Sequence, residues 1–170
     1  MPSNEALVLK LVQSVRLFAG FEVSEAQAFL DASKLEQHAA GKRLIEEGDT
    51  GYQMYVMLSG EVAVKRRVGN GETELARLGP GDTFGELALL DFGNRTASIE
   101  VLRDTRVLVA ERASLFRLTT LEGKLYRNLA IMMASRLRET DDMLSKLAEQ
   151  AETRSAFEKV ASQTQRFFVG

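Results

Sequence analysis

Gly85, Glu86 and Arg95 are the residues of this chain whose types and spacing best suit the binding of a phosphate. Gly85 has no Cβ, so an anion can approach its backbone, and the free N–H groups of a helical turn that follows would point toward that anion. The planar guanidinium of Arg95 can donate two parallel, charge-assisted hydrogen bonds to neighbouring phosphate oxygens. Glu86 is an acceptor only and is favoured in a first helical turn, where it can accept the proton of a sugar hydroxyl. The stretch 79–98 therefore predicts a cradle for a phosphate carried by a sugar.

Short runs typical of β-strands lie on both sides of this cradle. They are rich in Val, Ile, Tyr and Leu and span residues 43–46, 53–58, 61–67, 74–78, 96–102 and 106–111. Turn signals separate them at residues 48–49, 59–60, 69–71 and 79–82. The Gly-Asn-Gly of 69–71 is typical of a hairpin turn that needs positive φ. The pattern predicts a mainly β fold with flanking helices, in which the strands form an antiparallel barrel or jelly roll.

Helical periodicity appears at both ends of the chain. Residues 5–18 have apolar side chains at helical spacing, and residues 24–35 begin with Ser24 and Gln27 in a capping-box arrangement. After residues 113–116 the helical period returns, and Gly123 is expected to separate a short helix from a long one.

The long helix carries apolar positions that alternate steps of four and three residues. We call these positions the seam: Tyr126, Ala130, Met133, Leu137, Thr140, Leu144, Leu147 and Ala151. Such a repeat is typical of two helices packed along their length, so it predicts a parallel homodimer. The seam ends before residue 154, and we expect the tail, 153–170, to be helical or disordered.

The cradle resembles the phosphate-binding cassette of the cyclic nucleotide-binding domain family. The match covers residues 84–90 and 95–98, and glycine-punctuated motifs upstream resemble the β-roll of the same family in the same order, at residues 47–49, 54–56, 59–62 and 78–82. The resemblance extends from about residue 18 to about residue 140. It implies an N-terminal helix in 1–20, a β-roll in 21–122 with the cassette at 84–98, and a coiled-coil dimerisation helix in 123–152.

The resemblance also implies a ligand, cAMP or cGMP, and the residues that bind it. In the β-roll these are Phe84, Gly85, Glu86, Leu87, Ala88, Arg95, Thr96 and Ala97. On the long helix, Arg136 is placed to pair with Glu86, although an arginine beside a seam is also an ordinary solvated charge. Thr140 matches a residue that hydrogen-bonds the base in bacterial members of the family, although it is equally a small polar residue in the seam. A hydroxyl at Thr96 could accept from the exocyclic amine of guanine, so both nucleotides are expected to bind.

Composition excludes several other classes of site. The net charge of -2 gives no bulk attraction to nucleic acid or to an anionic membrane. The absence of cysteine excludes disulfides and thiolate metal sites, and His38 is the only histidine, which we expect at the end of the second helix in a structural or surface role. We therefore expect no metal site, no catalytic site and no cofactor other than the nucleotide. No membrane-spanning run or signal peptide is evident, so a cytoplasmic protein is expected.

Two classes of function remain open. One is a sensor, in which a cyclic nucleotide binds in the β-roll and repositions the long helix to regulate a downstream protein or an effector domain. The other is an enzyme or a ligand-independent scaffold built on the same roll. The chain could also be the regulatory part of a longer signalling enzyme or transcription regulator. About twenty residues follow the seam, too few for a helix-turn-helix domain, so no direct DNA binding by this chain is expected.

Overall fold

The computed structural model describes residues 10, 14–91 and 93–168 of the chain. It divides into two compact units, Met1–Leu129 and Ala130–Gly170. The first unit contains the sheet and the short helices, and the second is part of one long helix.

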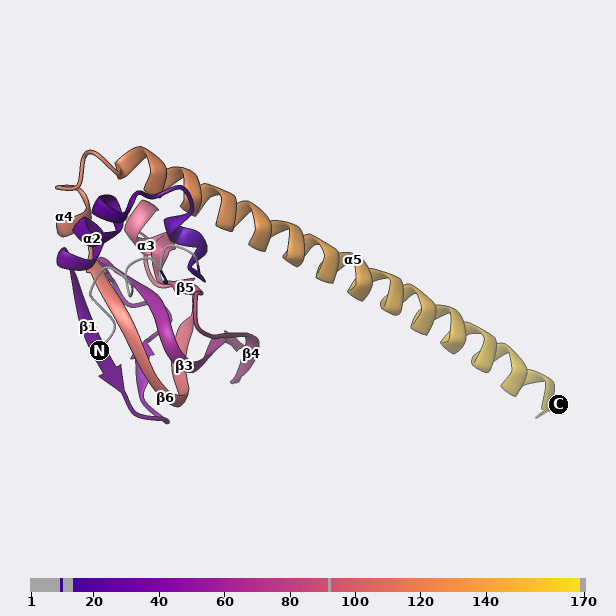
Figure 1. The fold of residues 1–170 in the computed structure, drawn as a ribbon. Helices are drawn as coiled ribbons and strands as arrows, with labels where there is room; N and C mark the ends of the chain where they lie inside the picture. The colour runs from indigo at the N-terminus through magenta and orange to yellow at the C-terminus, as the bar shows by residue number, and fades with distance from the viewer. Residues whose placement is uncertain (1–9, 11–13, 92, 169–170) are drawn as a thin grey trace. The chain divides into compact units, whose positions relative to one another are not determined.

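The first unit is built on an antiparallel sheet (Figure 1). Its strands are β1 (Ser33–His38), β2 (Arg43–Ile45), β3 (Gln53–Val68), β4 (Gly71–Leu78), β5 (Thr83–Phe84) and β6 (Ser98–Glu111). The strand order is β1-β6-β3-β4, with β2 paired to β6 and β5 paired to β3. The predicted antiparallel β fold with a long C-terminal helix is confirmed, and the sheet is not closed into a barrel.

Two strands are longer than the sequence predicted. The runs predicted at 53–58 and 61–67 form one strand, β3. The runs predicted at 96–102 and 106–111 likewise belong to one strand, β6. The glycine between the first two runs, Gly60, has φ 91° and makes no chain reversal. A Cβ there would lie 2.5 Å from the carbonyl oxygen of Asp104 and 2.7 Å from Cα of Thr105. Gly60 therefore marks an irregularity, where the register of β3 against β6 shifts, because only glycine allows the two backbones to come so close.

Two predicted turns are present as expected. Gly69 and Asn70 connect Val68 to Gly71, which pair with each other, and Gly69 has φ 59°. In the turn at 79–82, the Asp82 N–H donates to the carbonyl of Gly79 over 3.1 Å, and the Asp82 carboxylate accepts from the Gly79 N–H over 2.9 Å. Both turns depend on the residue types from which they were predicted.

The helices differ in detail from the sequence prediction. They are η1 (Arg16–Phe18), α2 (Val23–Asp31), α3 (Glu86–Asp91), α4 (Arg112–Leu115) and α5 (Glu122–Phe168). Most of the helix expected at 5–18 lies outside the described residues, and its last part forms the 3-10 turn η1. The capping box of α2 is made by Glu22 and Glu25, whose carboxylate accepts from the Glu22 N–H at 2.7 Å, and not by Ser24 and Gln27.

The second helix is shorter than predicted because a strand follows it. Residues 33–38 pair with β6 along their whole length, for example Leu35 with Leu108. His38 therefore lies at the end of β1, where Glu36 approaches its ring at 3.0 Å, and not at the end of a helix.

The last helix is one uninterrupted element. Gly123 is its second residue and does not separate two helices, because a glycine one position after the helix start interrupts no intrahelical hydrogen bond. The helix also continues through most of the tail, to Phe168.

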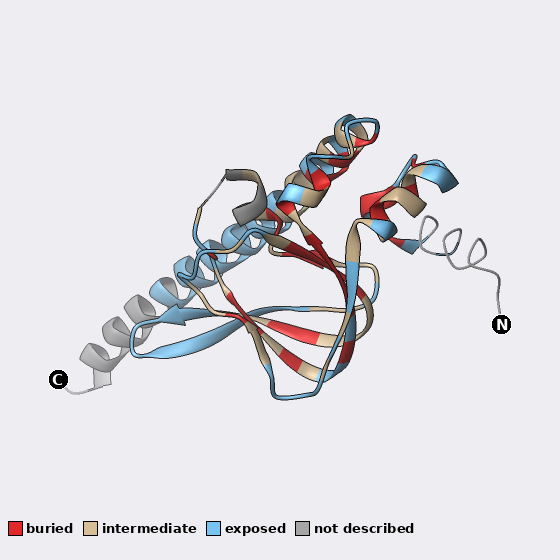
Figure 2. Cartoon of the chain, turned by 90° about the vertical axis from the view of Figure 1, so that its left-hand side faces the viewer, coloured by how far each residue is buried: buried red, intermediate tan, exposed pale blue. Residues whose placement is uncertain are grey.

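The apolar core lies on the inner face of the sheet and beneath the short helices at its end (Figure 2). The buried residues of the sheet core are Ile45, Tyr55, Met57, Val62, Phe84, Ile99, Val101, Val107 and Val109. Phe18 and Phe29 meet edge to face at 5.0 Å, and Phe21 lies 5.5 Å from Phe18. This second aromatic group packs η1 against α2.

Polar contacts fix the start of α5 within the first unit. The side-chain amide of Asn128, which is 3% exposed, donates to the carbonyl oxygens of Leu17 at 2.8 Å and Ala19 at 2.9 Å. Lys124 pairs with Glu25 at 2.7 Å, and this pairing lowers the pKa of Glu25. Both contacts join the first turns of α5 to the N-terminal segment of the sheet unit.

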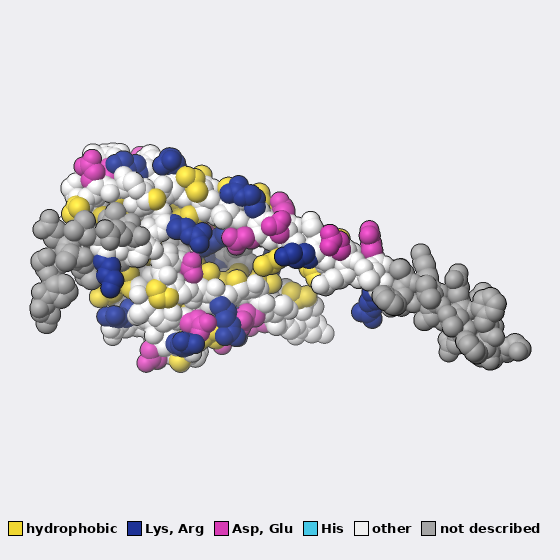
Figure 3. Space-filling model, turned by 45° about the vertical axis from the view of Figure 1, so that its right-hand side comes forward, with side chains coloured by type: hydrophobic (Ala, Val, Ile, Leu, Met, Phe, Trp, Pro, Cys, Tyr) yellow, Lys and Arg dark blue, Asp and Glu magenta, His cyan; other side chains and the backbone are white. Residues whose placement is uncertain are grey.

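A charged network joins four strands on the outside of the sheet. Arg43 on β2 donates to both carboxylate oxygens of Glu72 on β4 at 2.7 Å, and also contacts Glu46 and Glu100. Lys65 on β3 pairs with Glu100 on β6 at 2.7 Å. The hydrogen bonds to Glu72 are the largest cause of the raised pKa of Arg43. Figure 3 shows basic and acidic side chains interspersed over this unit, so the face in view has no large patch of one sign.

Candidate functional site

The predicted cradle begins where β5 ends. Phe84 pairs with Tyr55 of β3, and the two rings stack with their centroids 4.8 Å apart and an interplanar angle of 8°. Gly85 follows with φ 78°, a conformation that favours glycine, and Glu86 is the first residue of α3. The stacked ring pair and the glycine therefore determine where the short helix starts.

Arg95 is held to this turn by its backbone and by its side chain. Its N–H donates to the carbonyl of Asp49 and its carbonyl accepts from the N–H of Gly48, both at 2.8 Å. The guanidinium donates from Nη1 to the carbonyl of Gly85 at 2.8 Å and from Nη2 to the carbonyl of Gln53 at 2.9 Å. With 8% of its surface exposed, Arg95 is a buried cation whose position is set by two backbone acceptors.

The electrostatics around Arg95 reflect its burial. Burial lowers the pKa of the Arg95 guanidinium, and the nearby Tyr55 and Glu86 act in the opposite direction. Burial also raises the pKa of the Tyr55 hydroxyl, against a smaller effect of the Arg95 charge. Arg95 remains protonated because an arginine side chain does not lose its proton in proteins. Glu86 is 4% exposed, so the turn holds a buried carboxylate close to a buried guanidinium.

The other predicted residues of the cassette lie at its edges. Thr96 is exposed and Ala97 half-buried, and both form a bend before β6, which begins at Ser98 and not at the predicted residue 96. The Ser98 hydroxyl accepts from the N–H of Glu47 at 3.0 Å. Leu87 and Ala88 lie in α3; Leu87 is half-buried, and the side chain of Ala88 lies outside the described set.

Arg136 and Thr140 belong to the second unit and are described there by themselves. The Thr140 hydroxyl donates to the carbonyl of Arg136 at 2.9 Å, one helical turn earlier. Thr140 is exposed and Arg136 half-buried. The structure thus brings together the predicted residues of the cassette, and the predicted roles of these two helix residues stay predictions.

Sequence reasoning missed two residues that contact the guanidinium of Arg95. Gln53 supplies a carbonyl to the guanidinium, and its side-chain oxygen accepts from the hydroxyl of Tyr55 at 3.0 Å. Gly51 lies against the guanidinium of Arg95, and a side chain at position 51 would overlap the guanidinium. A search for turn glycines with positive φ would not have identified Gly51, because the φ of Gly51 is not in the left-handed region. Its importance comes from a contact with a residue distant in the sequence.

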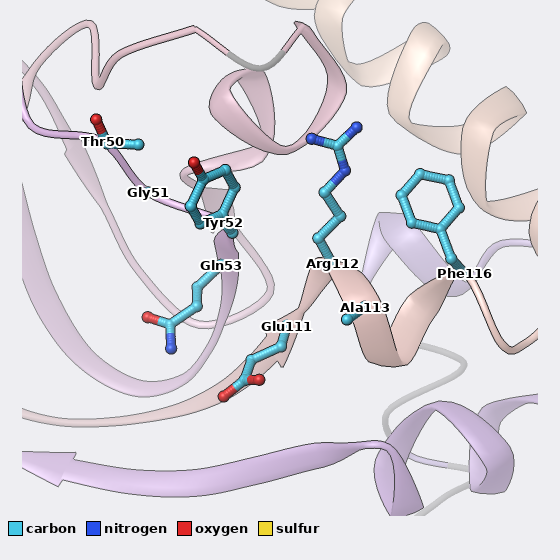
Figure 4. Close-up of a pocket in the computed structure, with 8 residues that line it drawn as sticks. All are labelled: Thr50, Gly51, Tyr52, Gln53, Glu111, Arg112, Ala113 and Phe116. Atoms are coloured by element: carbon cyan, nitrogen blue, oxygen red, sulfur yellow. The ribbon is translucent and has the colours of Figure 1, made fainter.

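An open depression lies next to these residues (Figure 4). It is lined by Thr50, Gly51, Tyr52, Gln53, Glu111, Arg112, Ala113 and Phe116. The guanidinium carbon of Arg112 lies 5.2 Å from the ring centroid of Phe116, and both side chains rise from the same side of α4. The described lining residues include none of the predicted ligand-binding residues, but Gly51 and Gln53, which contact the guanidinium of Arg95, are among them.

Two kinds of site find no support in the described residues. Nowhere among them do three or more His, Cys, Asp or Glu side chains converge in a way that could hold a metal ion. None of the described helices combines the length and the apolar character needed to cross a bilayer.

Comparison with known proteins agrees with this geometry. A family model described as the cyclic nucleotide-binding domain matches residues 35–120, about half of the chain. The chain belongs to the cyclic nucleotide-binding domain family. The matched segment includes the whole cassette, so the resemblance predicted from the sequence is confirmed.

Individual members of the family support the same assignment. A "Cyclic AMP receptor protein" from Thermus thermophilus is 37% identical over 83% of this chain, and the alignment covers 66% of that protein. A "cAMP-dependent protein kinase regulatory subunit" from Mycosarcoma maydis is 30% identical over 74% of this chain and 25% of its own length. The crystal structure of the Thermus thermophilus catabolite activator protein superposes with a TM-score of 0.71 and 36% identity, over 78% of this chain and 63% of that one.

The chain therefore spans less than two thirds of the length of these relatives. Their names describe a cAMP receptor and a kinase regulatory subunit, both regulatory proteins. The predicted absence of DNA binding receives no support from these comparisons, because it was argued from where the sequence ends and the relatives are longer proteins.

Proposed function

We propose that this chain is a cyclic nucleotide sensor that binds cAMP or cGMP with the cyclic phosphate against Arg95 and the turn at Gly85. The observation that carries the proposal is the buried guanidinium of Arg95, fixed to the carbonyls of Gly85 and Gln53 beside the first residue of α3. A buried cation with a fixed orientation favours an anion of defined geometry. The free-energy cost of removing water from the guanidinium arises on folding and not on ligand binding.

The donors and acceptors of the turn suit a cyclic phosphate ester on a ribose. A guanidinium has five N–H donors, and the two carbonyls use two of them, which leaves three that a phosphate can engage. Glu86, buried next to this cation, would accept the proton of the ribose hydroxyl next to the phosphate. The two side chains would thus recognise different parts of one ligand.

The base is proposed to contact Thr96 and Thr140. Thr96 directly follows Arg95, and its hydroxyl could accept from the exocyclic amine of a guanine that lies over its own phosphate. Thr140 could serve the amine of adenine from α5, and Arg136 could pair with Glu86. Both nucleotides are therefore expected to bind, and neither base contact requires a metal or a second cofactor.

The long helix is proposed to transmit the signal. Leu137, Leu144 and Leu147 of the seam are each about 60% exposed in the single chain, so we propose that they are covered in a parallel homodimer. Ligand binding would change the position of α5 and thereby regulate a downstream protein or an effector domain. We propose a cytoplasmic, non-catalytic role, either as a separate sensor or as the regulatory part of a longer protein.

Isothermal titration calorimetry of the unmodified chain tests this proposal. Cyclic AMP and cyclic GMP should each give saturable heat, and linear 5′-AMP and 5′-GMP, whose phosphates cannot take the cyclic geometry, should bind much more weakly. A ligand-independent scaffold would give no heat with either cyclic nucleotide. An enzyme acting on the ligand would convert it during the titration. Chromatography of the solution recovered from the calorimeter would then show the reaction product.

A further inference from the structure

Gly51 lies in the loop between β2 and β3, next to the guanidinium of Arg95. An ideally placed Cβ on Gly51 would lie 2.5 Å from Cζ of Arg95, and closer still to Nε and Nη2, whereas ordinary contacts of a Cβ begin at 3.4 Å. The guanidinium therefore occupies the space that a side chain at this position would need.

The backbone fixes this approach. The N–H of Arg95 donates to Asp49, the N–H of Gly48 donates to Arg95, and Thr50 forms a β-bridge with Asn94. These contacts hold the segment before Gly51 antiparallel to the segment that carries Arg95. A guanidinium that starts from this position and reaches the carbonyl of Gln53 has to pass over Gly51.

The first atoms that an alanine side chain at position 51 would meet are those of the guanidinium. The φ of Gly51 lies outside the left-handed region, so its backbone can accept an alanine, and the three nearest atoms to the added Cβ all belong to the Arg95 guanidinium group. A Cβ at Gly85 would also approach the guanidinium, at 2.6 Å from Nη1 of Arg95, but it would lie 3.0 Å from the carbonyl oxygen of Gln53 as well, and the φ of 78° strains any other residue there. Gly51 is thus the position where the guanidinium can be moved without straining the turn itself.

We propose that Gly51 is a positioning residue for the phosphate site. Its missing side chain allows Arg95 to bridge the carbonyls of Gly85 and Gln53, and this bridge orients the other N–H donors of the guanidinium. The proposal deepens the proposed function and rests on it for the identity of the ligand. The claim about the position of Arg95 can be tested without any ligand.

The first test measures thermal unfolding of the ligand-free protein in a double-mutant cycle. Gly51→Ala should lower the Tm by about 2–4 °C when Arg95 is present, because the displaced guanidinium leaves its two carbonyls. In an Arg95→Ala background the same change should have a much smaller effect on the Tm, since the three atoms nearest to the new methyl group are gone. An equal loss in both backgrounds, or a Gly51→Ala protein that does not fold, would overturn the proposal.

The second test measures cyclic nucleotide affinity by calorimetry. Gly51→Ala should weaken cAMP binding about tenfold, the size of effect expected when a charge-assisted hydrogen bond is misplaced. Gly71→Ala is the matched control, because its φ is also outside the left-handed region and an added Cβ would meet nothing within 4 Å. Unchanged affinity in a folded Gly51→Ala protein would refute the positioning role. If the unmodified chain binds neither cyclic nucleotide, the proposed function fails, and the Tm cycle still decides whether Gly51 positions Arg95.

Discussion

The two units of this protein use apolar residues in opposite ways. In the sheet unit, large side chains such as Met57, Val62 and Val107 have no exposed surface. In the long helix beyond residue 129, Leu137 is 62% exposed and Leu144 is 59% exposed. The sheet unit thus covers its own core, whereas the leucines of the seam stay uncovered in a single chain.

This difference indicates what each unit needs in order to function. The guanidinium of Arg95 is fixed by carbonyls of its own unit, so a single chain already provides the arrangement proposed to bind phosphate. The seam of the helix is proposed to need a second surface, because an exposed apolar stripe of this length costs free energy in water. Ligand binding and dimerisation should therefore be separable by mutation.

The largest expected effect tests the ligand-binding side of this comparison. Arg95→Ala should weaken cyclic nucleotide binding by about 2–5 kcal/mol, because it leaves the phosphate charge unpaired in a partly desolvated site. The mutant should remain folded and dimeric. Glu86→Ala should weaken binding less, since it removes only the contact with the ribose hydroxyl. Calorimetry measures both affinities, and a folded Arg95→Ala protein with unchanged affinity would remove the basis of the site.

The second prediction tests the helix side. Replacing Leu137 and Leu144 with glutamate should weaken dimerisation at least about 100-fold, because unpaired carboxylates would have to be buried between the helices. Sedimentation should then show monomers, with cyclic nucleotide binding retained. Ser145→Glu, which adds a carboxylate next to the seam, is the control and should stay dimeric. A monomeric unmodified chain at about 10–100 µM, where such a seam should hold, would contradict the dimer.

A third prediction concerns the contact that joins the start of α5 to the sheet unit. Asn128→Ala should lower the free energy of unfolding by about 1–3 kcal/mol, because it leaves the carbonyl of the buried Leu17, and that of Ala19, without their donor. Urea denaturation measures this change. The neighbouring exposed residue gives a matched control, since Arg127→Ala should change stability by no more than about 0.5 kcal/mol. Equal effects of the two substitutions would mean that the amide contributes no specific stability.

The smallest effect refines the choice of nucleotide within the sheet unit. Thr96→Ala should weaken cGMP binding by about 1–2 kcal/mol and change cAMP binding little, because only guanine presents an amine to the hydroxyl. Titration of both nucleotides against both proteins measures the difference, with cAMP as the internal control. Equal losses would show that Thr96 serves the phosphate alone. If the unmodified chain does not bind cGMP, cAMP is the remaining candidate.

The features that could be predicted from the sequence depend on local chemistry. The hairpin at 69–71 and the turn at 79–82 have the glycines that their backbone angles require, and runs rich in Val, Ile, Tyr and Leu marked β3 and β6. The cassette was recognisable because Gly85, Glu86 and Arg95 lie close together in the sequence.

The features that could not be predicted depend on contacts between distant segments. Residues 33–35 were assigned to a helix, yet they pair with β6, and strand pairing outweighs their local preference. Gly60 was interpreted as a turn because the sequence does not show that β3 and β6 approach closely there. The contact between Gly51 and Arg95 could not be predicted either, because the two residues are far apart in the sequence.

A crystal structure of the unmodified chain with cyclic AMP tests the central claim most directly. The account predicts that the cyclic phosphate accepts hydrogen bonds from the guanidinium of Arg95 and that the carboxylate of Glu86 accepts one from the ribose hydroxyl. A nucleotide bound elsewhere, for example in the depression lined by Tyr52, Arg112 and Phe116, with no contact to Arg95, would contradict it.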